Sequence, residues 1–236
     1  MAKFTYESLP RTIKAKGYLP GAYPQAFGPR YIDSALWDSA SLITAEFGEF
    51  VELNVGDDYA KEALTISSAT TAAELAVVVR DVAGFPSLGG GVISGPKEHV
   101  PLSVFIGTSG NKGKIVAILG EQGTTPAVAG QVYVGTGESA VITAGAFVVG
   151  TTYTITTAGS TDYTLIGAAD SVVGTIFVAT GVGAGTGTAT FTSEPGTVFT
   201  TDLHSKTLSA TNWKFAGTRF APTTSGNYVV EVEYIG

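Results

Sequence analysis

The chain has 236 residues and a net charge of −7, and only 14% of its residues are charged while 44% are hydrophobic. A charged fraction so far below the roughly 25% of ordinary soluble domains, together with 31 glycines, favours short strands joined by tight turns. The lack of cysteine excludes disulfides, thiolate nucleophiles and cysteine zinc sites, and it fits a protein made in a reducing cytoplasm. No apolar run approaches the ~18 residues of a membrane-crossing helix, and the N-terminus lacks the apolar region of a secretory signal.

Residues 1–30 are expected to form an extended basic arm. Four prolines and three glycines exclude a continuous helix or a central strand there. Five cations against one acid give the arm a net charge of about +4, which leaves about −11 on the rest of the chain. Such an arm suits docking on an acidic protein surface or on the body of a neighbouring copy, and dispersed cations suit nucleic acid poorly. The candidate contact residues are its cations and aromatic side chains, Arg11, Lys14, Lys16, Tyr18, Tyr23, Phe27 and Arg30.

Two simpler interpretations of the arm remain open. It could be a solvated terminus whose charges have no partner, or it could wrap around its own body. A fully extended segment of this length reaches roughly 100 Å, so contact with a neighbouring subunit is equally compatible with the sequence.

The segments from about residue 42 onward have the patterns of β-strands. Residues 50–55 alternate apolar and polar side chains, as a half-buried strand does. Residues 74–82 also resemble a helix start, because Thr71 and Glu74 have the spacing of a capping box, but three consecutive valines favour a buried strand. Further strands are expected over 99–107, 114–120, 130–135 and 227–236. The sequence therefore predicts an all-β protein with an antiparallel barrel or sandwich body.

Residues 139–193 contain only two charged side chains, Asp162 and Asp170. Four short β segments separated by glycine turns are expected there: VVGTTYTITTAG, TDYTLIG, VGTIFVATG and GTGTATF. We interpret 139–194 as a small β module inserted between two parts of the body, 31–138 and 195–236. Neutral strands of this kind aggregate if their edges stay open, so oligomer contacts or a closed module are expected.

No arrangement of residues in the sequence supports catalysis, a cofactor or a metal site. The two histidines, His99 and His204, occur without a nucleophile motif. The segment 107–114 lacks the spacing of a phosphate loop, and the alternate glycines of 181–187 lack a dinucleotide-binding context. The carboxylates of 46–58 lack the spacing of a calcium loop. Four aromatic residues could stack on sugars but are more often core residues: Trp37, Tyr153, Tyr163 and Trp213.

Several segments resemble the structural cement, or head-decoration, proteins of tailed bacteriophages. They are YIDSALWDSASLITAEFGEFVEL, AVVVRDV, GKIVAILGEQGTTPAVAGQVYVGTGE and the C-terminal NWKFAGTRF with NYVVEVEYIG, and the resemblance covers roughly 20–138 and 195–236. The insert separately resembles a module found in phage virion proteins, with the form F..G..Y.I...G.TD.T.IGA.....G..F.ATG...G.GTA from Phe147 to Ala189. This insert interrupts the pattern of an ordinary cement protein.

The resemblance implies a virion structural protein that binds the exterior of an expanded capsid and bridges neighbouring capsomers, with the insert projecting outward. Its expected partners are the major capsid protein and further copies of itself, commonly as a homotrimer, and neither nucleic acid nor a membrane. The chain is not expected to be an enzyme. A component of a tail, baseplate or head fibre, whose insert contacts a host-surface glycan, is the alternative. An enzyme acting on surface glycans is a third class.

Overall fold

The computed structural model describes residues 32–37, 45–46, 48–54, 61–64, 75–78, 92–93, 101–106, 113–121, 125–220 and 228–236. Within these ranges the regular structure consists of β-strands and one short 3₁₀ helix, with no α-helix. The predicted all-β class is confirmed. The expected arm, 1–30, and the seven candidate contact residues in it lie outside the described residues.

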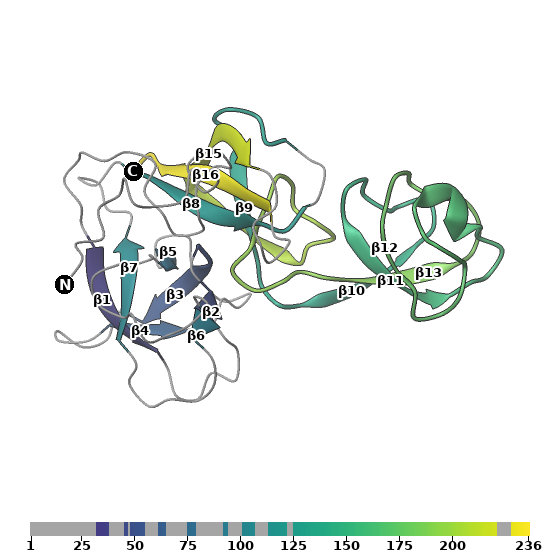
Figure 1. Cartoon of the computed structure of the whole chain (residues 1–236), viewed down its shortest axis with the longest axis horizontal. Coiled ribbons are helices and arrows are strands. Elements are labelled where there is room, and N and C mark those ends of the chain that lie inside the picture. The colour runs from purple at the N-terminus through teal and green to yellow at the C-terminus, as the bar shows by residue number, and fades with distance from the viewer. Residues whose placement is uncertain are drawn as a thin grey trace, which may run out of the picture.

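The first part of the body is a closed five-stranded barrel with the strand order β1-β4-β3-β5-β7 (Figure 1). All of its strand pairs are antiparallel except β1 with β4. A separate two-stranded sheet joins β2 to β6. The bounds of these strands are β1 Ile32–Trp37, β2 Ala45–Glu46, β3 Phe50–Asn54, β4 Lys61–Leu64, β5 Leu75–Val78, β6 Val92–Ile93 and β7 Pro101–Ile106.

The predicted strands of this region are confirmed. Strand β3 lies within 50–55 and strand β7 within 99–107. Within the ambiguous segment 74–82, residues Leu75–Val78 form β5, and all four are buried. A strand covered on both faces shows a continuous apolar run rather than alternation, which explains why its period did not separate strand from helix.

The second part of the body is another closed five-stranded barrel, with the order β14-β8-β16-β15-β9. Strand β14 runs parallel to β8, and the other pairs are antiparallel. The long strand β15 pairs first with β9 and then with β16, and a register shift occurs in each of these ladders. The bounds are β8 Lys114–Leu119, β9 Gln131–Gly135, β14 Val198–Phe199, β15 Thr207–Phe220 and β16 Tyr228–Tyr234.

The two barrels share one hydrophobic core, and Trp213 of β15 lies at its centre. Its fully buried indole ring makes edge contacts with Phe50 and Phe105 of the first barrel, at centroid distances of 5.1 and 5.8 Å. A third ring, Tyr234 of β16, lies 5.4 Å away. Aromatic pairs in this geometry add about 0.5–1.5 kcal/mol each beyond their buried area. The body is therefore two barrels packed as one unit.

Backbone hydrogen bonds also join the two barrels. Phe50 N–H donates to the Gly196 carbonyl at 2.9 Å, and Ile118 N–H donates to the Gly48 carbonyl at 3.1 Å. Gly196 has a φ of +77°, and a Cβ at this position would lie 2.6 Å from the Phe50 carbonyl oxygen. The close approach of the two backbones therefore requires glycine here.

Residues 139–192 form a separate four-stranded antiparallel sheet with the order β10-β13-β11-β12. Its strands are β10 Ser139–Thr143, β11 Thr152–Thr157, β12 Ile176–Val178 and β13 Thr188–Thr192. In Figure 1 this unit lies beyond one end of the body, and β10 and β13 connect the two. We call residues 139–193 the module.

Two details of the module differ from the sequence prediction. The segment TDYTLIG is not a strand but the 3₁₀ helix η3, Tyr163–Ile166, because the Asp162 carboxylate caps the Thr164 N–H and Gly167 ends the turn at a φ of 106°. Strand β10 was not predicted, since its pattern of short neutral side chains resembles the glycine-rich segments around it.

The shared core predicts that Trp213 stabilises both barrels at once. We expect Trp213→Ala to lower the free energy of unfolding by about 3–5 kcal/mol, the usual cost of emptying a large aromatic site. Trp213→Phe is expected to cost less, because it keeps a ring in the site and removes an indole N–H that has no partner in the described part of the chain. Denaturant unfolding, followed by circular dichroism, measures both values.

The exposed Leu165, with 80% of its surface accessible, provides the control. Leu165→Ala is expected to change stability by less than about 0.5 kcal/mol. A separate transition for the first barrel that Trp213→Ala leaves unchanged would contradict the shared core.

Candidate functional site

The root of the module is fixed to the body by polar contacts. Thr136 N–H donates to the Ser193 hydroxyl at 3.2 Å, and that hydroxyl donates to the Glu138 carbonyl at 3.1 Å. The Glu138 carboxylate in turn pairs with the Lys206 ammonium at 3.2 Å. These bonds tie the two strands that enter and leave the module to the start of β15.

The hydrophobic core of the module includes side chains from the body. Phe199 of β14 and Leu203, in the following loop, are 2% and 0% exposed and belong to the same buried cluster as the module's aromatic rings. Phe199 makes an edge contact with Phe191 of β13 at 6.0 Å. The module and the body therefore meet through a packed apolar joint and not only through the two connecting strands.

His204 joins this apolar joint to the module by a hydrogen bond. Its Nε2 lies 2.9 Å from the Tyr153 hydroxyl, which also accepts from the Val148 N–H at 2.9 Å. The phenol can therefore give its own proton to a neutral imidazole. The imidazole ring also makes edge contacts with Tyr153 and Phe191, at 6.1 and 5.6 Å.

The surroundings of His204 favour its neutral form. Burial lowers the pKa of His204 below its ordinary value of 6.5, while the Asp202 carboxylate opposes this shift. Burial also raises the pKa of Tyr153 above 10.0, with the Val148 N–H acting in the opposite direction. His204 has a φ of 54°, a left-handed conformation that is uncommon outside glycine but is tolerated by histidine and asparagine.

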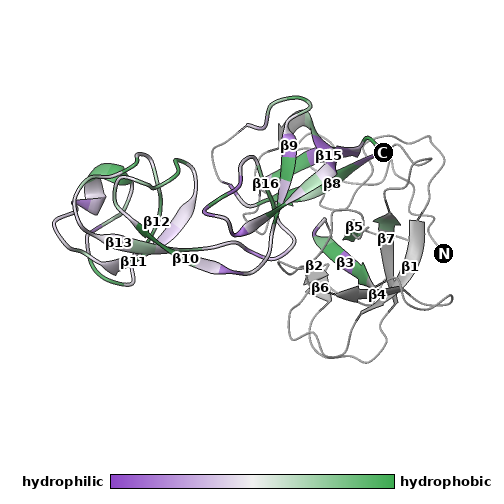
Figure 2. Ribbon diagram, turned by 180° about the vertical axis from the view of Figure 1, so that it is seen from behind, coloured by the Kyte–Doolittle hydropathy of each residue, from purple (hydrophilic) through white to green (hydrophobic). Residues whose placement is uncertain are grey.

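The outer face of the module sheet carries hydroxyl groups instead of charges. In β11 and β13 threonine alternates with buried aromatic or aliphatic residues, so one face holds the core and the other holds threonine. The neighbouring strands add Val141 and Ile176, which are 65% and 69% exposed. Figure 2 shows only small purple areas on the module, in line with this lack of charge.

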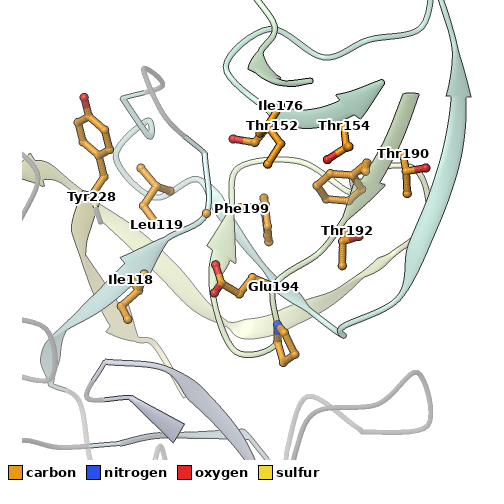
Figure 3. Close-up of a pocket in the computed structure, with 13 residues that line it drawn as sticks. Ile118, Leu119, Thr152, Thr154, Ile176, Thr190, Thr192, Glu194, Phe199 and Tyr228 are labelled. Carbon is orange, nitrogen blue, oxygen red and sulfur yellow. The ribbon is translucent and has the colours of Figure 1, made fainter. Parts of the chain in front are cut away.

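A groove of about 440 Å³ lies between this outer face and the second barrel (Figure 3). The module contributes its wall through threonines of β11 and β13, together with Ile176 and Phe191. The body wall consists of side chains from β8, β14 and β16 and the segment before β14. The body residues that line it are Ile118, Leu119, Gly120, Glu194, Pro195, Phe199 and Tyr228.

The two carboxylates of the module have local structural roles. Asp162 caps η3, as described above, and Asp170 accepts from the Val172 N–H at 3.1 Å and from the Thr175 hydroxyl. The Thr175 hydrogen bond, followed by the Val172 N–H, holds the pKa of Asp170 below its ordinary value. Within the described ranges, no three His, Asp or Glu side chains lie together as a metal site would require.

The structure places the other sequence candidates as follows. Tyr153, Tyr163 and Trp213 are at most 1% exposed, so they are core residues and not sugar-stacking platforms. The alternate glycines of 181–187 form a loop packed on the module core, where a Cβ on Gly187 would lie 2.6 Å from the Tyr163 hydroxyl oxygen. His99 and the arm residues lie outside the described part of the chain. Among the described residues, no helix is long and apolar enough to cross a bilayer.

Sequence reasoning missed both the groove and the joint at His204. The groove combines residues from 118–120, 152–154, 176, 190–199 and 228, and no spacing along the chain indicates such a set. The alternation of threonine with aromatic residues in 152–157 and 188–192 was the available signal for the module face.

Because His204 is held neutral, acid is expected to loosen the joint. The unfolded chain binds the His204 proton at a higher pH than the folded chain does, so the stability that this residue contributes is complete above about pH 6.5. It is lost as the pH falls from there through the lower pKa of the folded state. Thermal unfolding between pH 7.5 and 5.0 should therefore show a decline that is smaller in His204→Asn, since asparagine tolerates the same backbone conformation and does not titrate.

His99 is present in both proteins, so its titration cancels in the comparison. Asp202 and Glu121 are the carboxylates that act on this hydrogen-bonded pair, and both are kept. An identical pH dependence of the two melting temperatures would show that His204 does not titrate on unfolding.

Comparisons with protein-family models, with curated proteins and with solved structures find no match to this chain. No family assignment is drawn from these comparisons.

Proposed function

We propose that this chain is a virion structural protein that decorates the exterior of an expanded phage capsid and stabilises it by bridging neighbouring capsomers. The observation that supports this most directly is the architecture: a double-barrel body carries a separate, nearly uncharged module through a packed joint. Such an arrangement suits a protein whose body is anchored and whose module faces solvent.

The module surface suits close approach between copies of the chain. In the described part of the chain, the sheet ends at β10 on one side and at β12 on the other. Neither of these edge strands carries a charged residue, a proline or a bulge of the kind that usually blocks edge pairing. Open edges of this kind can pair with other chains and aggregate. Neighbouring copies that cover the edges would prevent this, which supports self-association such as the expected homotrimer.

The charge distribution supports binding of the body through the arm. The arm, 1–30, carries about +4 against about −11 on the remainder, so it complements an acidic capsid surface or the body of a neighbouring copy. Many copies that bind only the expanded shell stabilise that state by mass action. The proposed partners are the major capsid protein and further copies of this chain, with neither nucleic acid nor a membrane involved.

A non-enzymatic role is part of the proposal. Within the described residues, the buried Glu121 carboxylate accepts hydrogen bonds from Thr200. His204 forms a hydrogen bond with the Tyr153 hydroxyl at the joint between module and body. The hydrogen bonds of these groups hold the fold together, and we assign none of the groups a role as nucleophile or base.

A second candidate function is a component of a tail, baseplate or head fibre whose module contacts a host-surface glycan. The groove beside the module favours this candidate, since it is lined by hydroxyl and apolar side chains. The two functions differ in the location of the protein on the particle.

Electron microscopy of intact particles with gold-labelled antibody tests the location. We expect label at regular positions over the whole head. Label restricted to the tail or to one vertex would overturn the decoration proposal and support the second candidate.

Rebinding to particles that lack the protein tests the arm. The triple variant Arg11→Gln, Lys14→Gln, Lys16→Gln is expected to bind about 3- to 150-fold more weakly at low salt, because each exposed ion pair contributes about 0.2–1 kcal/mol. The difference should shrink as the salt concentration rises. Sedimentation of particles with labelled protein measures the affinity.

The matched control adds the same charge change to the module. Leu165, Val172 and Val173 are 80%, 61% and 60% exposed, and Leu165→Glu, Val172→Glu, Val173→Glu should bind as the unchanged protein does. Equal weakening by both triple variants would indicate a general charge effect and contradict a specific role of the arm.

A further inference from the structure

We propose that the groove between the outer face of the module sheet and the second barrel is a binding site for a neutral carbohydrate. The proposal does not depend on where the chain lies in a particle, so it can fail while the decoration proposal stands. It concerns the described groove residues and not the basic arm.

The dimensions of the groove suit a short saccharide. Its volume of about 440 Å³ lies within the roughly 300–1,000 Å³ of typical small-molecule sites. The two walls come from units joined by the packed joint at Phe199 and Leu203. The site is therefore formed before any ligand arrives, which lowers the entropic cost of binding.

The module wall provides hydrogen-bonding groups without bound partners. Thr152, Thr154 and Thr190 line the groove, and their hydroxyls have no hydrogen-bond partner among the described residues. The register of the sheet pairs Thr154 with Thr190 on adjacent strands, so two hydroxyl-bearing side chains stand side by side. A hydroxyl both donates and accepts, as the hydroxyls of a sugar do, so it can bind them in either orientation.

Apolar side chains line the rest of the groove. Ile176 borders it from the module side, and Leu119 and Tyr228 border it from the body side (Figure 3). Pro195 also belongs to the body side. A pyranose ring has an apolar C–H face as well as polar edges, and an aromatic or aliphatic surface can cover that face. The lining thus combines the two kinds of contact that a sugar offers.

The charged residues in the groove lining indicate whether a neutral or an anionic sugar binds there. Among the described residues that line the groove, Glu194 is the only charged one, and no lysine, arginine or histidine is included. A sialylated, sulfated or phosphorylated ligand would bring its charge to a lining to which these residues supply no cation. Neutral hexoses and N-acetylhexosamines carry no charge that needs such a cation.

The test uses the full-length protein with four neutral oligosaccharides, maltotriose, mannotriose, lactose and chitotriose, and with sialyllactose as the anionic comparison. Saturation-transfer NMR detects contact and calorimetry gives the dissociation constant. We expect at least one neutral probe to bind and sialyllactose to bind more weakly than lactose. The double variant Thr154→Val, Thr190→Val keeps the shape of the wall and should weaken binding about 5- to 150-fold through the loss of two hydrogen bonds.

Thr143→Val is the matched control, because Thr143 lies on β10 outside the groove and is exposed. It should bind the probe as the unchanged protein does, and all variants should melt at similar temperatures, since valine suits a strand as well as threonine does. Binding of none of the neutral probes would overturn the proposal. Equal binding by the double variant and the control, or tighter binding of sialyllactose than of lactose, would overturn it as well.

Discussion

Phe199 and Leu203 follow the module in the chain, yet they lie in the same buried cluster as the module's own aromatic rings. A unit of roughly 60 residues buries only about 60% of the surface that its unfolded chain exposes, so apolar side chains supplied by the body matter to its stability. Strand β14 therefore has two sets of contacts. The Phe199 side chain packs in the module core, while the backbone of the strand pairs with β8 and β9 of the second barrel. This shared packing fixes the direction in which the module stands, and the groove and the His204 hydrogen bond both depend on it.

The outer face of the module sheet carries hydroxyl groups rather than charged side chains. Strands β11 and β13 place threonine on one face and tyrosine, isoleucine, alanine or phenylalanine on the other, so hydroxyl groups provide the hydration that lysine or glutamate provides elsewhere. The face still bonds within itself, since Ser139 and Thr192 are linked across adjacent strands at 2.8 Å. A neutral face of this kind imposes little long-range electrostatic repulsion on an approaching molecule.

The strands that alternate or contain runs of valine could be predicted from the sequence, whereas the longest strand, β15, was not among those expected. Residues 50–54 and 114–119 follow from that pattern alone. The division of the body into two barrels could not be predicted, because it depends on the pairing of β14 with β8 and β9 and on the two register shifts of β15. Turn chemistry explains the error at TDYTLIG: the Asp162 cap and Gly167 outweigh the β propensity of the residues between them. Nothing in the sequence around His204 indicates its hydrogen bond to Tyr153, because only the fold brings the two residues together.

The groove follows from the return of the chain from the module to the body. Six of its lining residues lie between Thr190 and Phe199, where β13 leaves the sheet and β14 enters the second barrel. That short segment therefore belongs to both walls, and Gly196 fixes its path by lying against the backbone of Phe50. A displacement of the first barrel would thus be transmitted to the segment that borders the groove, because the Phe50 N–H is bonded to Gly196 and the Phe50 ring is packed on Trp213. The groove is, for this reason, a property of the whole body and module together, and neither unit would present it alone.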